Sequence, residues 1–173
     1  WCKFILLATD FLTLFSSLFI AYEVLDIARG GRFYFPLEEF NTYVLIHACV
    51  SFVGVLWFWI RLRHYTYRKP FWFELKEIIR TLLILFIIEL AIVAFSRLYV
   101  SRYFWSVTWI CIFVGLPFSR IFVKNLLIKS GMYLKETIII GNGKNAKEVF
   151  NALNNESYLG FDIKLFVTTE DYH

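Results

Sequence analysis

The stretch "RLRHYTYRKPFWFELKEIIRT", residues 61–81, separates two long apolar runs and decides how the chain is arranged. It carries six Lys and Arg side chains among several aromatic rings. Because basic residues beside an apolar helix are retained on the cytoplasmic side of a membrane, we expect this stretch to be a cytoplasmic loop. Its cations would then lie near anionic headgroups. Binding of a phosphate-bearing lipid or of a partner domain is the functional alternative for the same cations.

The composition on either side of this loop is that of a membrane protein. Of the 173 residues, 59% are hydrophobic and only 18% are charged, whereas an average soluble domain is about 45–50% apolar. The formal net charge of +4 comes from basic residues beside the apolar runs. This pattern suits an anionic membrane surface and argues against a nucleic-acid partner.

Four segments are long and apolar enough to cross a hydrocarbon core of about 30 Å. Each must be helical, because lipid offers no partner to backbone amides. The fold class predicted is therefore an α-helical integral membrane protein, with its four transmembrane helices in residues 1–130. The predicted spans are 4–24, 43–60, 82–100 and 104–123.

The loops give the orientation of these spans. Residues 61–81 and the segment after the fourth span are rich in Lys and Arg. On the other side, the first loop has only Arg29 and Arg32, offset by four carboxylates, and the loop between spans three and four has Arg97 and Arg102. We therefore expect both chain ends to face the cytoplasm.

Pro70 is expected to begin a short interfacial helix that leads into the third span, because proline is tolerated in a first turn. The apolar residues after it fall on one helix face and the charged residues mostly lie elsewhere. The apolar set is Phe71, Leu75, Ile78 and Ile79, and the charged set is Glu74, Lys76, Glu77 and Arg80.

Asp10, His47 and Glu89 are among the ionisable residues that lie inside the predicted spans. An acidic residue at the bilayer centre costs about 2.5–3.5 kcal/mol on insertion scales, so each carboxylate needs a partner. Counting about 1.5 Å per residue from the cytoplasmic ends, we expect Asp10 or Glu89 to pair with Arg120. A proton or substrate path is the alternative. His47 is expected to be an interfacial hydrogen-bonding residue and not a metal ligand.

After residue 131 the pattern becomes strand, turn, helix and strand, which predicts a Rossmann-like unit over 131–173. Gly141, Gly143 and Ala146 have G-x-G-x-x-A spacing, which makes them candidate nucleotide-binding residues. The acidic residue that usually holds the ribose is missing from the end of the second strand, since Glu170 and Asp171 come late. A scaffold used for packing or assembly is therefore the other interpretation, and the one that this gap favours.

Catalytic and metal-binding patterns do not occur in the sequence. There is no serine with a nearby base, no paired carboxylates on a soluble helix and no Walker loop. The three cysteines stand singly and are expected to fill apolar space. Two strands cannot form a covered parallel sheet and the chain begins with Trp1, so we expect a fragment that continues in both directions.

Two stretches carry a resemblance to a known family: "GVLWFWIRLRHYTYRKPFWFELKEIIRTLLI" and "LPFSRIFVKNLLIKSGMYLKETIIIGNGKNAKEVFNALNNESYLGFDIKLF". The chain resembles the amino-terminal half of the large bacterial polyprenyl-phosphate sugar phosphotransferases. That resemblance implies transfer of galactose-1-phosphate from UDP-galactose to undecaprenyl phosphate at the cytoplasmic face of the inner membrane, which starts an O-antigen or exopolysaccharide unit. It also implies four membrane helices, a Rossmann-like domain, and a later catalytic domain with an acidic dyad and Mg²⁺.

The resemblance thus implies the membrane-anchoring and assembly half of such a transferase, inactive alone and forming a homodimer. The catalytic residues and the magnesium site would lie beyond His173, and glucose is the nearest alternative sugar. The alternative function is a self-contained four-helix membrane scaffold or small transporter with a nucleotide-sensing tail. Reading the sequence that follows residue 173 would separate the two.

Overall fold

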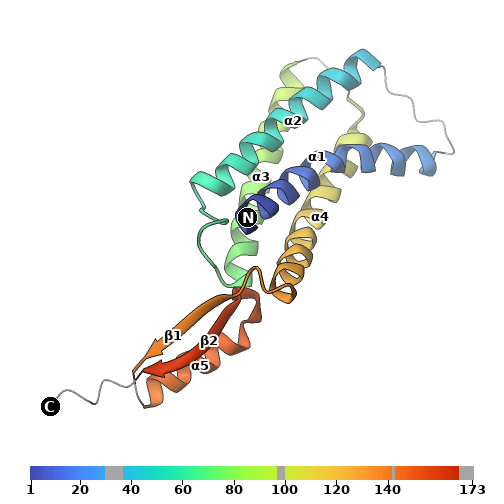
Figure 1. Ribbon diagram of the computed structural model, residues 1–173. Helices are drawn as coiled ribbons and strands as arrows, with labels where there is room; N and C mark the ends of the chain where they lie inside the picture. The colour runs from blue at the N-terminus through green and yellow to red at the C-terminus, as the bar shows by residue number, and fades with distance from the viewer. Residues whose placement is uncertain (30–36, 97–99, 142, 168–173) are drawn as a thin grey trace.

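Four long helices make up most of the molecule (Figure 1). The structure is a computed structural model that describes residues 1–29, 37–96, 100–141 and 143–167. Each helix is long and apolar enough to cross a membrane, which confirms the predicted α-helical membrane protein. The helices are α1 (Cys2–Ala28), α2 (Leu37–Ile60), α3 (Phe71–Phe95) and α4 (Arg102–Lys129).

The outer surface of the helices is as apolar as their interior, as expected of helices that face lipid. Leu12, Ile87 and Phe118, for example, all point outward. Inside, α1 packs most extensively against α4. A Cβ at Gly54 of α2 would lie 2.7 Å from the Leu85 side chain of α3, so glycine permits the close approach of these two helices.

The third helix differs from its prediction. The predicted short helix after Pro70 and the predicted span that starts at residue 82 are one continuous helix, which runs from Phe71 to Phe95. No helix breaker lies between these residues, and Pro70 occupies the position before the first turn, as predicted. The charged residues of the first two turns do not all lie away from the packed face, since Glu74 is 2% exposed. Their partners are described below.

The tail after α4 is a β-α-β unit. It comprises β1 (Lys135–Ile140), α5 (Lys144–Asn155), the short 3₁₀-helix η1 (Ser157–Leu159) and β2 (Phe161–Val167). The two strands pair in parallel, with Lys135 opposite Phe161 and Ile140 opposite Val167. Strand, turn, helix and strand therefore occur in the predicted order.

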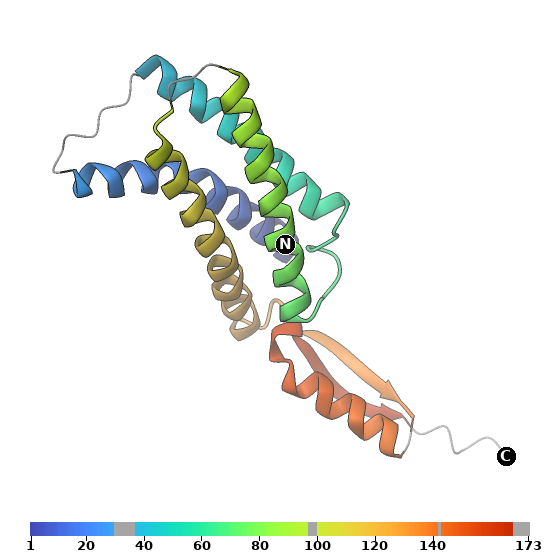
Figure 2. The ribbon, with the colours of Figure 1, turned by 180° about the vertical axis from the view of Figure 1, so that it is seen from behind.

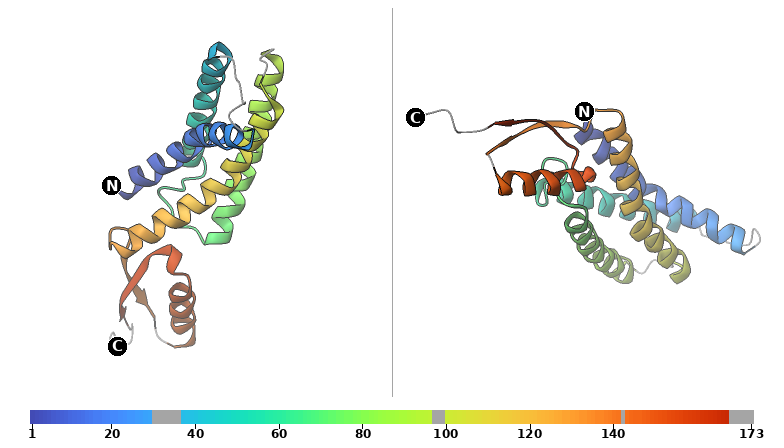
Figure 3. Two further views of the ribbon diagram at one scale, coloured as in Figure 1. Left: turned by 90° about the vertical axis from the view of Figure 1, so that its right-hand side faces the viewer. Right: turned by 90° about the horizontal axis from the view of Figure 1, so that it is seen from below.

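The tail lies at one end of the bundle, where α3 begins and α4 ends, and its strands lead away from the helices (Figures 1 and 2). Figure 3 shows that it extends the bundle lengthwise and does not pack along its side. The connection between α2 and α3, residues 61–70, lies at this same end. Two stretches that are distant in sequence therefore meet at the base of the bundle: the 61–70 connection with the start of α3, and the end of α4 with the tail.

Candidate functional site: a buried ion network at the base of the bundle

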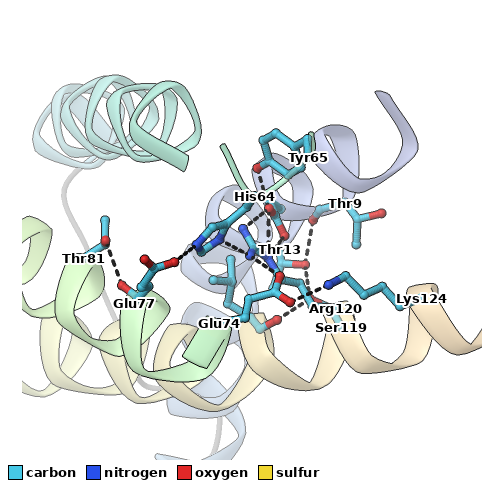
Figure 4. A network of polar contacts seen from close by, with 12 residues as sticks. Thr9, Thr13, His64, Tyr65, Glu74, Glu77, Thr81, Ser119, Arg120 and Lys124 are labelled. Carbon is cyan, nitrogen blue, oxygen red and sulfur yellow. Dashed lines mark hydrogen bonds and ion pairs between the residues drawn. The ribbon is translucent and has the colours of Figure 1, made fainter. Parts of the chain in front are cut away.

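Charged and polar side chains collect where the bundle meets the tail (Figure 4). They come from α1, α3, α4, the 61–70 connection and η1, and most are buried. Together they form one hydrogen-bonded group, which we call the basal network. Its members are Asp10, His64, Tyr65, Lys69, Glu74, Glu77, Arg120, Lys124 and Tyr158.

Arg120 is the centre of the basal network. Its Nε donates to Asp10 Oδ1 at 2.9 Å and its Nη2 donates to Asp10 Oδ2 at 2.5 Å, which gives a two-pronged ion pair between α4 and α1. Its Nη1 donates to Glu74 Oε1 of α3 at 2.9 Å. The prediction that Arg120 pairs with Asp10 or Glu89 is thereby confirmed for Asp10. A planar guanidinium suits this role because it can donate to several acceptors at fixed angles.

His64 links Arg120 to α3. Arg120 Nη1 lies 2.6 Å from His64 Nδ1, and because an arginine can only donate, Nδ1 must be the acceptor. The proton of the neutral ring is then on Nε2, which donates to Glu77 Oε2 at 2.7 Å. Burial first, and then the positive charges of Arg120, Lys69 and Lys124, lower the pKa of His64 to about 2. The imidazole therefore stays neutral at physiological pH.

The turn that delivers His64 and Tyr65 depends on an unusual backbone conformation. Arg63 has a φ of 52°, in the left-handed region that residues other than glycine rarely adopt. The following two side chains point into the bundle, where the Tyr65 hydroxyl donates to Asp10 Oδ2 at 2.5 Å. Burial and the negative charge of Asp10 raise the pKa of Tyr65, so this hydroxyl remains a donor.

The carboxylate of Glu74 connects the bundle to the tail. Besides Arg120, it accepts hydrogen bonds from Lys124 of α4 and, at 2.9 Å, from the Tyr158 hydroxyl of η1. The ammonium of Lys124 also lies 4.2 Å from the centroid of the Tyr158 ring. Burial and the nearby Glu74 raise the pKa of Tyr158, which keeps its hydroxyl protonated.

Arg68 makes a second connection to the tail. Its Nη1 donates to the carbonyl oxygens of Leu159 at 2.8 Å and Gly160 at 2.5 Å, and its Nη2 donates to that of Tyr133 at 2.6 Å. Gly160 has a φ of 64°, and a Cβ there would lie 2.8 Å from the Tyr133 ring. Only glycine fits this crossing of the two backbone segments.

The charges of the basal network balance. Three carboxylates, Asp10, Glu74 and Glu77, face three cations, Lys69, Arg120 and Lys124. Buried charges are tolerated only when paired and hydrogen-bonded, and removing one partner is strongly destabilising. Each charged group of the network is thus paired with a group of opposite charge. The arrangement is that of a joint between helices and tail.

A second, smaller cluster lies within the bundle, where Glu89 of α3 is fully buried. The Tyr43 hydroxyl donates to Glu89 Oε1 at 2.6 Å, and His47 Nδ1 lies 3.1 Å from both carboxylate oxygens. His47 Nε2 faces the Leu14 carbonyl oxygen at 3.0 Å and must donate to it. One proton is thus shared between Nδ1 and the carboxyl group. The prediction that His47 is a hydrogen-bonding residue is confirmed, but the residue is buried among the helices and not at their interface with solvent.

The glycine-rich turn lies between β1 and α5, as its spacing predicts. Gly141 and Gly143 have φ values of 135° and 95°, and a Cβ on either would meet no atom within 4 Å. Gly143 caps the N-terminus of α5, and Ala146 lies in its first turn. Nucleotide binding by these three residues stays a prediction. Glu170 and Asp171 lie outside the described residues.

Metal binding finds no support in the described part of the chain. No group of three or more His, Cys, Asp or Glu side chains there could hold a metal ion. The cysteines are free, and the prediction that they fill apolar space in the core is wrong for Cys49, which is exposed on the outside of α2. The thiol of Cys2 donates to the Met132 carbonyl oxygen at 3.2 Å.

Several members of the basal network were not predicted from the sequence. Glu74 was expected to lie off the packed face, and no partner was expected for His64, Lys124 or Tyr158. One signal was available: Arg120 and Lys124 are four residues apart and therefore lie on the same face of α4. Two cations on one face inside a membrane helix require buried acids on its neighbours.

Comparison with known proteins identifies the class. No family model matches the chain. A Haemophilus influenzae protein described as an uncharacterized sugar transferase is 50% identical over 170 residues, which are 98% of this chain and 36% of that protein. An Erwinia amylovora UDP-galactose-lipid carrier transferase is 47% identical over 131 residues, 76% of this chain and 28% of that protein. The chain is thus a homologue of membrane sugar transferases.

A third relative has a name that states both the sugar and the lipid carrier. The Salmonella typhimurium undecaprenyl-phosphate galactose phosphotransferase is 43% identical over 173 residues, 98% of this chain and 36% of the relative. This chain is therefore homologous to the amino-terminal part of undecaprenyl-phosphate galactose phosphotransferase, which confirms the resemblance seen in its sequence. It spans only about a third of the length of the relatives that it matches.

Proposed function

We propose that this chain is the membrane-anchoring and assembly part of a transferase that moves galactose-1-phosphate from UDP-galactose to undecaprenyl phosphate. The reaction would initiate O-antigen or exopolysaccharide synthesis. The observation that carries this proposal is the 43% identity, over 98% of the chain, to a phosphotransferase of that name. Four helices that can span a membrane agree with a lipid-linked substrate.

The proposed location is the bacterial inner membrane, with both chain ends in the cytoplasm. The basic 61–81 stretch supports this orientation. The first residues of α1, the 61–70 connection and the tail share the basal end of the bundle, so one orientation suffices for all three. A nucleotide-sugar donor and a lipid phosphate would meet at that surface.

The role proposed for the basal network is to hold the tail in a fixed position against the helices. Glu74 with Tyr158, and Arg68 with three backbone carbonyls, make this connection from two sides. The tail would be the start of a Rossmann-like domain, with Gly141, Gly143 and Ala146 as its candidate nucleotide contacts. The acidic dyad, Mg²⁺ binding and a homodimeric assembly are proposed for the whole protein.

The test compares the whole protein with residues 1–173 alone in lipid nanodiscs that contain undecaprenyl phosphate. With UDP-galactose and Mg²⁺, the whole protein should release UMP and place the sugar phosphate on the lipid, whereas residues 1–173 should do neither. UDP-glucose in place of UDP-galactose tests the sugar. Turnover by residues 1–173 would contradict the division of labour, and a whole protein inactive with both donors would contradict the assigned reaction.

A further inference from the structure

A cavity of about 450 Å³ opens beside the basal network, between the start of α1, the 61–70 connection and the two tail segments that follow α4 and η1. Lys3, Thr66, Tyr67, Arg68, Lys135 and Phe161 are among its lining residues. Leu6 and Met132 add apolar surface. The cavity is therefore formed jointly by the bundle and the tail.

The charges that line this cavity have one sign. Lys3, Arg68 and Lys135 contribute three cations, and no Asp or Glu is among the lining residues that the structure describes. His64 also lines the cavity but is held neutral. Inside the basal network every cation faces a carboxylate, so the cavity next to it stands out as an uncompensated positive site.

Arg68 shows that this positive charge is part of the structure and does not depend on a freely moving side chain. Its guanidinium donates to three backbone carbonyls and lies 4.5 Å and 5.3 Å from the ring centroids of Tyr133 and Phe161. Carbonyls and rings position a guanidinium without neutralising it. Within the described residues Lys3 and Lys135 form no ion pair, and both are exposed. An anion would satisfy all three cations.

The position of the cavity specifies the kind of anion. Helix α1 has 27 residues and is therefore about 40 Å long, which matches a bilayer with its headgroup layers. Lys3 lies in the first turn of this helix, and Met132 follows the end of α4 by three residues. The cavity is thus at the level of lipid phosphates, and the exposed Met132 adds apolar surface beside it.

We propose that this cavity binds the phosphate group of an anionic membrane phospholipid, with Lys3 and Lys135 as its counter-charges and Arg68 as a fixed cation behind them. A bound headgroup would join the bundle to the tail from the membrane side. This lipid site does not depend on the transferase activity proposed above, because it needs neither the sugar donor nor the lipid acceptor.

The experiment titrates phosphatidylglycerol into the purified whole protein and measures retained lipid by native mass spectrometry. The wild type should hold one phosphatidylglycerol molecule tightly. The double variant Lys3→Gln/Lys135→Gln should bind it more weakly by about five-fold for each lysine removed. The single variant Lys3→Glu, which reverses one charge, should also weaken binding. Both lysines are exposed, so an unchanged melting temperature is expected to show that the variants fold.

The matched control is Lys144→Gln/Lys147→Gln, which removes the same charge from the exposed surface of α5. Equal loss in the control and in the cavity variant would overturn the site. Two further arms test the source of the phosphate, with inorganic phosphate and with undecaprenyl phosphate as competitors. Displacement of phosphatidylglycerol by millimolar inorganic phosphate, or retention of undecaprenyl phosphate alone, would overturn the assignment to a bilayer phospholipid.

Discussion

The basal network and the Tyr43–His47–Glu89 cluster satisfy buried charge in two different ways. In the basal network, three carboxylates and three cations from several elements cancel one another around Arg120. In the inner cluster, the carboxyl group of Glu89 accepts a hydrogen bond from the Tyr43 hydroxyl and shares a proton with the His47 imidazole. The first joins helices to the tail, whereas the second links α2 to α3 and, through the Leu14 carbonyl oxygen, to α1. Disruption should therefore cost most in the basal network.

The largest effect is expected from Arg120→Leu. This change leaves Asp10 and Glu74 without their main partner, so the free energy of unfolding should fall by about 3–5 kcal/mol. Thermal unfolding in detergent measures the loss. Arg102→Leu, at the exposed far end of the same helix, is the control and should change little. Equal melting temperatures for the two variants would show that the basal network does not stabilise the fold more than an exposed charge does.

The inner cluster should respond less strongly. Glu89→Leu removes the acceptor of the Tyr43 hydroxyl and the partner of His47 Nδ1, at a cost of about 2 kcal/mol. Glu38→Leu, at the exposed start of α2, is the control. The same unfolding assay applies. A loss larger than that of Arg120→Leu would reverse the ranking of the two clusters.

His64 of the basal network should make the stability of the protein depend on pH. Its folded pKa of about 2 lies below the ordinary value of 6.5, so only the unfolded state takes up the proton between these limits. Its contribution to stability is complete above pH 6.5 and is lost as pH falls, at up to about 1.4 kcal/mol per unit. His64→Gln should flatten the melting profile between pH 6.5 and 5. An unaltered slope in the variant would show that other groups cause it.

The smallest effect is expected where the basal network reaches the tail. Tyr158→Phe removes one hydrogen bond to Glu74, worth about 1 kcal/mol. Amide exchange in β1 should accelerate while the melting temperature of the bundle stays nearly constant. Tyr103→Phe, an exposed tyrosine in the first turn of α4, is the control. Slower or unchanged exchange in β1 would mean that Tyr158 does not hold the tail.

The sequence was sufficient for the parts of the fold that depend on local composition. The four spans and the β-α-β order follow from apolar length and periodicity, and the Asp10–Arg120 pair follows from depth along two helices. The same counting failed for Glu89, because the third helix begins at Phe71 and not at residue 82. With eleven more residues ahead of it, Glu89 lies too far from the base to reach Arg120.

The members of the basal network that were missed share a physical cause. Glu74 and His64 are polar residues in a charged stretch, and such residues usually face water. Their burial depends on the turn at Arg63 and on cations supplied by α4, more than forty residues later in the chain. A local sequence pattern cannot show a partner that lies so far away in the chain. Tyr158 was missed for the same reason, since its partner Glu74 lies in the bundle.

The cancellation of charge in the basal network predicts how the junction of bundle and tail responds to dissolved ions. Dissolved ions screen exposed charges within about 8 Å at physiological ionic strength, but they screen buried pairs such as Arg120 with Asp10 much less. Changes in osmolarity or potassium content should therefore leave the angle between bundle and tail unaffected. A solvent-facing pair such as Lys164 with Asp162 would loosen instead. The junction between bundle and tail should therefore be insensitive to the salt content of the surrounding solution.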